Sequence, residues 1–368
     1  MSAPLIHAVI LAGGAGERFW PASRRSHPKP FLRVVGGQSL LDATLERARR
    51  FAGEDRVWVV CGQEHAGALR RATGLPASRV LVEPHRRNTA MAVAWAAERI
   101  AAEDPDAVMA VLPADHHIPD PRRFAADIRR AARAARDAEV LVTLGVEPTR
   151  PDTGYGYISV GDPAGSRFAG LHRVERFVEK PNLATARRYL SQGGFLWNAG
   201  VFVWTARVFL EEVETWAGEL HRALAPLRKK PKGRNRAAVE AAYRRAPSLP
   251  VDTAVMEPSR RVWTLPVSFA WSDVGTWSSL AEELGVGQRV GKGPLEGEGN
   301  RVIEGEVLAE EARGNLIWGG ERLIALLGVE DLAIVDTEDV ILITKLDRSP
   351  DVKRFVAVLT AKGREGLT

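Results

Sequence analysis

The chain has 368 residues, of which 45% are hydrophobic and 26% are charged, and its formal net charge is +5. These values are typical of a globular protein with more than one domain, and the small basic excess is consistent with a polyanionic ligand. The sequence has one cysteine, no basic leader and no apolar run near the ~20 residues that span a bilayer. An internal disulfide is therefore excluded, and we expect a cytoplasmic protein without membrane association.

Short apolar runs alternate with longer amphipathic runs from the N-terminus to Thr205. The runs predicted as strands are Ala8–Leu11, Val57–Cys61, Val80–Val82, Ala107–Leu112, Val140–Gly145, Gly156–Val160, Arg173–Glu179 and Gly200–Thr205. The runs predicted as helices are Leu40–Phe51, Gly67–Thr73, Thr89–Glu103 (capped by Asn88) and Pro121–Asp137. This alternation predicts a Rossmann-like α/β fold, with a mostly parallel sheet flanked by helices.

The pattern changes towards the C-terminus. A glycine-rich stretch at 285–299 predicts a linker, strand-like runs separated by turns follow at 300–345, and a last helix is predicted at 351–362. No internal repeat is evident here. The sequence thus predicts an α/β domain over residues 1–285 and a small β-rich domain over residues 286–368.

The loop after the first predicted strand is rich in glycine and basic residues, but it matches neither well-known phosphate loop. A P-loop requires Lys and then Ser or Thr after its last glycine, whereas Gly16 is followed by Glu17 and Arg18. The dinucleotide-binding fingerprint requires a third glycine where Phe19 stands. Another kind of anion-binding loop is therefore indicated.

The same loop has the components of an anion site. Backbone N–H groups near Gly13, Gly14 and Gly16 can approach phosphate oxygens because glycine has no side chain. Arg18 and Lys29 add cationic donors, and prolines on both sides of Lys29 restrict the backbone that carries it. The alternative is a glycine-rich turn with surface bases, and the flanking prolines favour the anion site.

Two carboxylates stand in loops later in the chain. Asp115 comes soon after the apolar run at 107–112, and Asp273 lies in "FAWSDVGTW". Each can hold Mg²⁺ by one oxygen while substrate phosphates fill other positions. The alternatives are a helix or turn cap for Asp115 and an Asx turn for Asp273, and spacing alone does not bring the two residues together.

Three further segments combine polar side chains with aromatic residues, as carbohydrate sites do. They are "TGYGYI" with Gly156, "FVEKP" with Glu179 and Lys180, and "LWNAGVFVW" with Asn198 and Gly200. Lys180 can meet a phosphate, and Glu179 can accept hydrogen bonds from hydroxyl groups. Taken singly, each segment is better explained as a strand end with a surface charge.

Together these motifs resemble the nucleotidyltransferases that make nucleotide sugars, and more narrowly the mannose-1-phosphate guanylyltransferases. The resemblance runs from Leu11 to Trp277 and continues in "GVEDLAIVDTEDVILI" near the C-terminus. Its motifs are "LAGGAGERFWPASR", "HPKPF", "EPHRRNTA", "LPADH", "GYGYI", "FVEKP", "WNAGVFVW", "VDTAVME" and "WSDVGTW". The resemblance implies that residues 1–285 form a nucleotidyltransferase catalytic domain.

The resemblance also implies a reaction and the residues that serve it. The phosphate of mannose 1-phosphate attacks the α-phosphorus of GTP in line, and pyrophosphate leaves. The implied catalytic residues are Arg18 and Lys29 at the β- and γ-phosphates, Lys180 at the attacking phosphate, and Asp115 and Asp273 as Mg²⁺ ligands. The implied sugar-phosphate contacts are Gly156, Glu179, Lys180, Asn198 and Gly200. The implied nucleotide contacts are Leu11, Ala12, Gly13, Gly14, Gly16, Glu83, Pro84, Asn88, Thr89 and Ala90.

Two alternative functions stay open. Within the class, the substrates could be glucose 1-phosphate with UTP, dTTP or ATP, although "EPHRRNTA" favours the guanylyl branch. From another class, a regulatory or nucleic-acid-binding protein could keep the fold, although the five implied catalytic residues favour an enzyme. We expect no nucleic-acid partner, no isomerase activity and a homodimer. Glu17 departs from the family pattern, and we expect it to point away because its carboxylate would repel a triphosphate.

Overall fold

The computed structural model describes residues 4–14, 16–228, 236–287 and 299–368. Most of the predicted glycine-rich linker and the basic run "RKKPKGRNR" lie outside the described residues. The chain divides into two compact units. The first unit contains the described residues of Met1–Gly13, Thr44–Ala114 and Ile118–Trp271, and the second contains those of Gly14–Ala43, Asp115–His117 and Ser272–Thr368.

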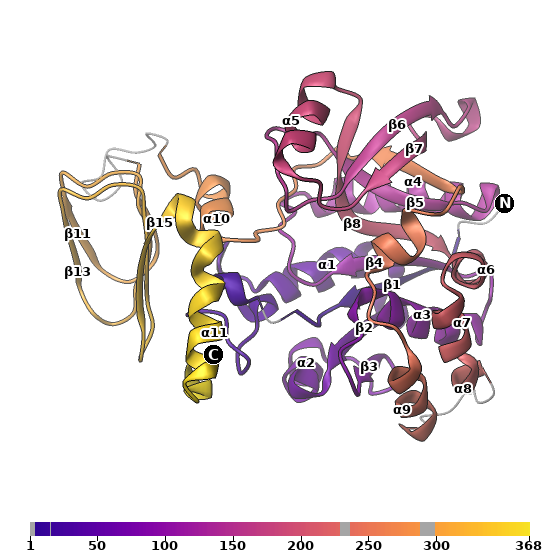
Figure 1. Cartoon of the computed structure of the whole chain (residues 1–368), viewed down its shortest axis with the longest axis horizontal. Helices are drawn as coiled ribbons and strands as arrows, with labels where there is room; N and C mark the ends of the chain where they lie inside the picture. The colour runs from indigo at the N-terminus through magenta and orange to yellow at the C-terminus, as the bar shows by residue number, and fades with distance from the viewer. Residues whose placement is uncertain (1–3, 15, 229–235, 288–298) are drawn as a thin grey trace. The chain divides into compact units, whose positions relative to one another are not determined.

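Within the described residues, the first unit contains one sheet of nine strands in the order β3-β2-β1-β4-β8-β5-β9-β7-β6 (Figure 1). The strands are β1 (Ile6–Leu11), β2 (Val57–Gly62), β3 (Val80–Glu83), β4 (Val108–Pro113), β5 (Leu141–Val146), β6 (Tyr157–Pro163), β7 (His172–Val178), β8 (Phe195–Thr205) and β9 (Val262–Pro266). The predicted strands are confirmed apart from their ends, and β9 is an additional one. The α/β fold is confirmed as well.

The expectation of a mostly parallel sheet needs a correction. Strands β1 to β4 pair in parallel, as do β5 and β9. The long strand β8 runs antiparallel to both β4 and β5, and β6 and β7 also make antiparallel pairs. The sheet is therefore mixed, because β8 lies between β4 and β5 and runs antiparallel to both of them.

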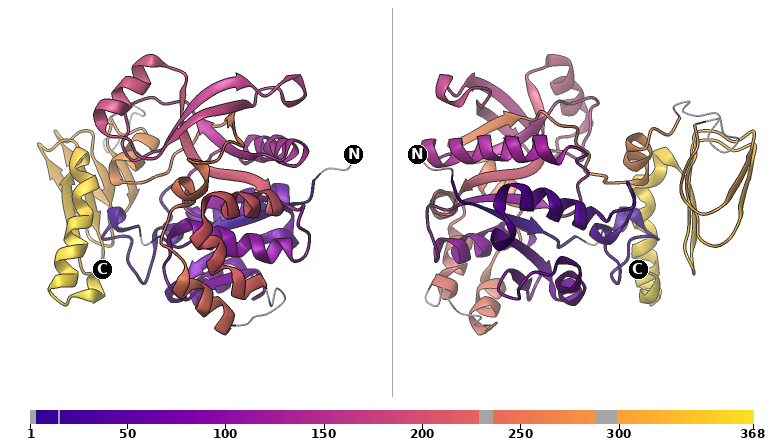
Figure 2. Two further views of the ribbon diagram at one scale, coloured as in Figure 1. Left: turned by 45° about the vertical axis from the view of Figure 1, so that its right-hand side comes forward. Right: turned by 180° about the vertical axis from the view of Figure 1, so that it is seen from behind.

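The helices of the first unit pack on this sheet or on one another. They are α1 (Leu40–Ala52, whose first turn belongs to the second unit), α2 (Ala66–Thr73), α3 (Asn88–Ala101), α4 (Pro121–Ala138), α5 (Leu183–Gln192), α6 (Ala206–Trp216), α7 (Gly218–Ala223), α8 (Ala225–Arg228) and α9 (Arg236–Arg245). Helices α1 and α4 lie side by side, with the rings of Phe51 and Phe124 6.1 Å apart (Figure 2). Helix α3 packs against α6, β1 and β2. Within the described residues, no helix is long and apolar enough to cross a membrane.

The start of α3 differs from the prediction in one detail. Asn88 is the first residue of the helix rather than its cap, and Arg87 occupies the cap position. Asn88 has a φ of 59°, and its Oδ1 accepts a hydrogen bond from the N–H of Thr89 at 2.8 Å. A short polar side chain that accepts from the N–H of the next residue suits this left-handed conformation.

The second unit is built mainly from short strands. The strands are β10 (Arg301–Glu304), β11 (Val307–Glu310), β12 (Leu316–Trp318), β13 (Ile324–Leu327), β14 (Leu332–Asp336) and β15 (Ile341–Lys345), with helices α10 (Trp277–Glu283) and α11 (Lys353–Ala361). Strands β10, β12 and β14 stack in parallel, β11 and β13 form a second parallel pair, and β15 closes the first stack antiparallel to β14. Alternating strands that stack in two sheets are typical of a coiled β-solenoid.

Buried asparagines connect successive turns of this solenoid. Asn315 is fully buried, and its Nδ2 donates to Asn300 Oδ1 at 3.0 Å and to the carbonyl oxygen of Val329 at 3.2 Å. Its Oδ1 accepts from the N–H of Leu332 at 2.9 Å. The Asn315 side chain therefore satisfies backbone groups of the following turn of the solenoid.

Replacing Asn315 with alanine is expected to lower the free energy of unfolding of the second unit by about 2–4 kcal/mol, because it leaves buried polar groups unpaired. Hydrogen–deuterium exchange of the amides of residues 301–345, measured by mass spectrometry at increasing urea concentration, reports this change for Asn315→Ala. Glu306→Ala, at an exposed position of the same part, is the control and should change the stability by less than about 0.5 kcal/mol. Equal stability of both variants would contradict the proposed role of the side chain.

Candidate active site

Lys29 holds two segments of the second unit that contain the predicted metal ligands. Its Nζ donates to Asp115 Oδ2 at 2.7 Å and to the carbonyl oxygen of Asp273 at 2.7 Å. The structure therefore brings together three predicted catalytic residues that stand far apart in the sequence. Neither the spacing nor the local pattern of the sequence required this association.

Local structure fixes the position of the Lys29 side chain. Lys29 lies between Pro28 and Pro30, and it is the first residue of a short 3₁₀ helix, Lys29–Phe31. The residue is 6% exposed, and its Nζ lies 5.7 Å from the centre of the Phe19 ring. We predicted that the two prolines restrict the backbone of Lys29. The 3₁₀ helix at Lys29 and the burial of its side chain are consistent with this prediction.

A two-residue pairing brings the segments of Asp115 and Asp273 side by side. The N–H of His117 donates to the carbonyl oxygen of Ser272 at 2.9 Å, and the N–H of Ser272 donates back to His117 at 3.0 Å. His117 Nε2 also lies 3.2 Å from Glu283 Oε1 on α10. The backbone pairing and the Lys29 contacts together position both aspartates.

The surroundings of Asp115 keep its carboxylate ionised. Burial alone would raise its pKa, but the Lys29 charge, the neighbouring His116 and the hydrogen bond from Lys29 outweigh burial and lower the pKa below its usual value. Asp115 does not cap a helix, since Asp120 caps α4 by accepting from the N–H groups of Arg122 and Arg123. The helix-cap alternative for Asp115 is therefore wrong.

Asp273 lies in a tight turn, as the alternative from the sequence proposed. Its Oδ1 accepts from the N–H of Gly275 at 3.0 Å, which is the hydrogen bond of an Asx turn. The next residue, Val274, has a φ of 42° and is fully buried. The turn fixes the side chain of Asp273, and a carboxylate can serve an Asx turn and a cation at the same time, so the two roles are compatible.

The donor set of this group fits a divalent cation that is shared with a substrate. Across the described residues, no cluster of three or more His, Cys, Asp and Glu side chains is arranged to hold a metal ion by itself. Two carboxylates are nevertheless sufficient when phosphate oxygens complete the coordination, which is the usual way in which Mg²⁺ binds at phosphate-transfer sites. Lys29 shows that this position already accommodates a positive charge.

Gly16 lies directly against Lys29. Its φ is 68°, and a Cβ atom at this position would lie 2.4 Å from Lys29 Cβ and 2.8 Å from Ser23 Oγ. Only glycine fits this left-handed conformation without strain. The glycine therefore permits the close approach that places Lys29.

Replacing Gly16 with alanine is expected to lower the free energy of unfolding by about 2–4 kcal/mol, because the new methyl group adds both steric overlap and backbone strain. Gly14 is the matched control, since a Cβ there meets no atom within 4 Å. Denaturant unfolding of Gly16→Ala and Gly14→Ala should differ by that amount. Equal stabilities would contradict the packing described for Gly16.

Arg18 and Glu17 occupy a 3₁₀ helix, Glu17–Phe19, in the same unit. Both residues are exposed, whereas Phe19 is buried. The structure therefore does not place Arg18 in contact with Lys29, Asp115 or Asp273. The role of Arg18 at the phosphates stays a prediction, and so does the orientation of Glu17 relative to a bound nucleotide.

The predicted nucleotide contacts at the end of β3 lie in the first unit, close to the end of β1. Glu83 Oε1 accepts from the buried hydroxyl group of Tyr243 at 3.1 Å, and a Cβ at Gly13 would lie 3.6 Å from Glu83 Oε2. Burial is the main reason why the pKa of Glu83 is raised to about 7; the Glu64 charge adds to the effect, and the Tyr243 hydrogen bond opposes it. Glu83 therefore changes its charge near neutral pH.

The rest of this group is held by the segment that follows α9. Thr89 Oγ1 accepts from the N–H of Val251 at 2.9 Å, and the N–H of Ala90 donates to Leu249 at 3.1 Å. Two of the remaining nucleotide candidates lie at the end of β1: Leu11 is its last residue, and the N–H of Ala12 donates to the carbonyl oxygen of Val60 at 2.8 Å. Of the other three, Gly14 and Asn88 are exposed and Pro84 is half-buried.

The predicted sugar residues form one group, also in the first unit. The N–H of Asn198 donates to the carbonyl oxygen of Gly156 at 2.8 Å, and a Cβ at Gly156 would lie 2.6 Å from Glu179 Oε2. Lys180 Nζ forms an ion pair with Glu179 Oε1, and Lys180 has a φ of 45°. Gly200, with a φ of 64°, donates its N–H to Asn198 Oδ1 at 3.0 Å. The structure thus brings together all five predicted sugar residues.

Several residues around these groups were not predicted to take part. Asp252 Oδ1 accepts from Asn198 Nδ2 at 2.9 Å, and Glu257 Oε1 accepts from the N–H of Glu179 at 2.9 Å. Tyr243 is the third such residue, through its bond to Glu83. The motif "VDTAVME", which contains Asp252 and Glu257, was the one signal in the sequence that pointed to them.

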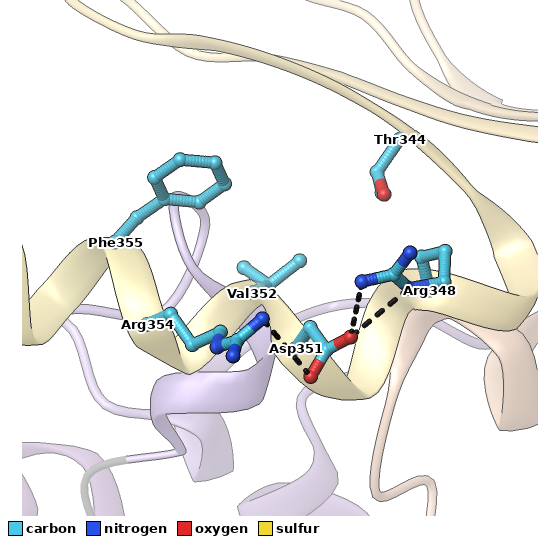
Figure 3. A pocket seen from close by; sticks show the side chains of 6 residues that line it. All are labelled: Thr344, Arg348, Asp351, Val352, Arg354 and Phe355. Carbon is cyan, nitrogen blue, oxygen red and sulfur yellow. Dashed lines mark hydrogen bonds and ion pairs between the residues drawn. The ribbon is translucent and has the colours of Figure 1, made fainter.

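A hollow of about 390 Å³ lies elsewhere in the second unit, at the start of α11. Its lining residues are Thr344, Arg348, Asp351, Val352, Arg354 and Phe355 (Figure 3). Arg348 and Arg354 both pair with Asp351, at 2.9 and 4.0 Å. None of the predicted site residues is among these lining residues.

Comparison with known proteins finds two family models in this chain. Residues 7–285 match the family model described as Nucleotidyl transferase, and residues 305–359 match the model described as MannoseP isomerase/GMP-like beta-helix domain. The alginate biosynthesis protein AlgA of Pseudomonas aeruginosa is 37% identical over 361 residues, which cover 97% of this chain and 72% of that protein.

Two further relatives are similar over nearly the whole chain. The mannose-1-phosphate guanylyltransferase of Escherichia coli (strain K12) is 36% identical over 375 residues, which cover 99% of this chain and 75% of that protein. A crystal structure described as mannose-1-phosphate geranyltransferase from Thermus thermophilus has a TM-score of 0.85 at 33% identity, and the match covers 97% of this chain and 99% of that one.

Proposed function

The chain belongs to the nucleotidyl transferase family, and from this premise we propose that it transfers GMP from GTP to α-D-mannose 1-phosphate, giving GDP-mannose and pyrophosphate. The observation that carries the proposal is the 36% identity, over 99% of this chain, to a protein described as mannose-1-phosphate guanylyltransferase. The association of Lys29 with both candidate metal-binding segments supports the same class of reaction, since phosphate transfer needs concentrated positive charge beside fixed carboxylates.

The residues of the second unit serve the triphosphate in this proposal. Asp115 and Asp273 would hold Mg²⁺, which supplies neutralisation of phosphate charge when it is bound. Lys29 is fixed by its two hydrogen bonds and adds a buried positive charge at the same position. Arg18, which is exposed, is available to phosphate oxygens of the leaving pyrophosphate.

The residues of the first unit serve the sugar phosphate. A phosphate oxygen of mannose 1-phosphate forms a bond to the α-phosphorus of GTP. At the same time the bond from this phosphorus to the oxygen that bridges it to the β-phosphorus breaks, and pyrophosphate leaves with that oxygen. Lys180 orients the attacking phosphate, while Glu179 and Asn198 bind hydroxyl groups of the sugar. Reactions of this kind depend on positioning and charge stabilisation rather than on a covalent intermediate.

Glu83 gives the proposal a pH dependence. Guanine presents its N1–H and its 2-amino group, and only an ionised carboxylate accepts hydrogen bonds from both. With a pKa of about 7, and with Tyr243, Glu64 and Arg86 as its polar neighbours, Glu83 is mostly protonated at pH 6 and mostly ionised at pH 8. The affinity for a guanine nucleotide should therefore rise with pH through this range.

Calorimetry with GDP-mannose tests this dependence, because the phosphates of this ligand do not titrate near neutrality. We expect the affinity to increase about tenfold from pH 6 to pH 8, which follows from the ionised fraction of a carboxyl with this pKa. Glu83→Gln should bind more weakly at pH 8 and should show no such increase. A flat profile for the unmodified protein would refute the role of the ionised carboxylate.

The activity itself is tested by incubating the protein with GTP, mannose 1-phosphate and Mg²⁺. GDP-mannose and pyrophosphate should form in equal amounts, and excess EDTA should stop the reaction. The absence of either product would contradict the proposal. The homodimer and the domain boundary at residue 285 stay predictions; light scattering of the purified protein and expression of residues 1–285 alone test them.

A further inference from the structure

The segment Leu249–Glu257 contacts both groups of candidate ligand-binding residues in the first unit. At its start, Leu249 and Val251 make the hydrogen bonds to Ala90 and Thr89 on the nucleotide side. At its other end, Glu257 accepts from the N–H of Glu179 on the sugar side. Between these contacts the backbone adopts a π-helix at Asp252–Met256, a conformation that is rare and occurs frequently at functional sites.

Asp252, Thr143 and Gly200 together set the orientation of the Asn198 amide. Asn198 Oδ1 accepts from the hydroxyl group of Thr143 and from the N–H of Gly200, each at 3.0 Å. These two donors occupy the oxygen, so the amide nitrogen faces Asp252 Oδ1 at 2.9 Å. Among the described residues, Asp252 is the one hydrogen-bond acceptor for this nitrogen, and one of its two N–H groups is left for a ligand hydroxyl.

The environment of Asp252 couples it to the rest of the sugar group. Burial is the main reason why the pKa of Asp252 is raised to about 6, and the Glu179 charge adds to this effect. Lys180 and the hydrogen bond from Asn198 favour the ionised form. Asp252 is therefore close enough to both Glu179 and Lys180 to interact electrostatically with the predicted sugar-phosphate ligands.

We propose that Asp252 is a positioning residue for the sugar: it holds the Asn198 amide so that its second N–H donates to a sugar hydroxyl group. This inference rests on the proposed function, because it takes the Gly156, Glu179 and Asn198 group as the sugar site. Asp252 does not contact the sugar itself; it acts by holding Asn198, and it takes no part in the bond-making step. Asp252 should therefore increase the affinity for ligands that contain the sugar, and it should not affect the affinity for the nucleotide alone.

Calorimetric binding of GDP-mannose and of GDP to the full chain separates these effects. Asp252→Ala should weaken GDP-mannose about tenfold or more and should leave GDP within about twofold, because it removes the acceptor that orients Asn198. Asp252→Asn keeps an acceptor oxygen at the same position and should restore GDP-mannose binding to within about threefold of the unmodified protein. Thr253→Ala, which changes a neighbouring residue of the same π-helix, is the control and should bind both ligands normally.

Two results would overturn the inference. One is Asp252→Ala with unchanged GDP-mannose affinity, and the other is equal weakening of GDP and GDP-mannose, which indicates a general structural role. If the alanine variant does not fold, as thermal unfolding would reveal, Thr143→Val provides the second test: it removes one donor that fixes the amide and should also weaken GDP-mannose more than GDP. The proposed function fails separately, when the unmodified protein forms no GDP-mannose from GTP and mannose 1-phosphate.

Discussion

Replacing Asp115 with asparagine is expected to lower kcat for GDP-mannose formation at least about a thousandfold, because the amide lacks the charge that a magnesium ion and Lys29 require. The variant should still fold. Asparagine has the same shape and keeps an acceptor for Lys29 Nζ, which also retains its 2.7 Å bond to the carbonyl oxygen of Asp273. Steady-state kinetics at saturating GTP and mannose 1-phosphate, with a thermal unfolding curve for each protein, measures both effects.

Asp120 is the matched control for this experiment. It is half-buried, stands five positions after Asp115, and caps α4 with its carboxylate. Asparagine is an equally good helix cap, so Asp120→Asn should keep kcat within about twofold of the unmodified protein. Near-normal turnover by Asp115→Asn would remove Asp115 from the reaction and leave its ion pair with Lys29 as a structural contact.

Replacing Lys180 with glutamine is the second large effect that we expect, with a loss of about a hundredfold in kcat/KM for mannose 1-phosphate. The side chain of Lys180 is 61% exposed, so its charge is accessible to a phosphate and contributes little to folding. The KM for GTP should change less than about threefold. Initial rates measured with each substrate varied in turn separate the two constants.

Arg187 supplies the control for Lys180. It is an exposed cation on α5, seven positions further along the chain, and it makes no contact with the predicted sugar group that the structure describes. Arg187→Gln should therefore have normal kinetics. If Lys180→Gln raised the KM for GTP and for mannose 1-phosphate equally, Lys180 would act on the whole site rather than on the attacking phosphate.

The sequence predicted the elements well where local pattern decides the structure. The alternation of apolar and amphipathic runs indicated β1 to β8 and α1 to α4, because burial on one face imposes the period of each element. It did not predict that β8 pairs with both β4 and β5, since the order of strands depends on contacts between distant segments. Strand β9 was missed, as were α5 to α10.

The candidate site shows the same division. The prolines around Lys29 and the glycine at position 16 pointed to a constrained loop, and the packing of Gly16 against Lys29 gives the reason. The association of Asp115 with Asp273 was not predictable from spacing, because it depends on the pairing of His117 with Ser272. Asp252 was missed because a carboxylate in a helical pattern resembles a surface residue until its buried partner, Asn198, is known.

The sequence predicted a β-rich C-terminal part, but it did not predict that these strands form a β-solenoid. Its stacked strands are offset by 15 residues from Arg301 to Leu316 and by 17 from Leu316 to Ala333, so no fixed repeat length is present. Asn300 and Asn315, which occupy equivalent corners 15 residues apart, were the clearest available signal. Buried side chains that satisfy backbone groups at such corners explain why asparagine recurs there.

A competition experiment tests the central claim most directly. The protein is given equal concentrations of GTP, UTP, dTTP and ATP together with equal concentrations of mannose 1-phosphate and glucose 1-phosphate, in the presence of Mg²⁺, and the nucleotide sugars formed at early times are identified by mass spectrometry. We expect GDP-mannose to be the main product. Predominant formation of UDP-, dTDP- or ADP-glucose would contradict it.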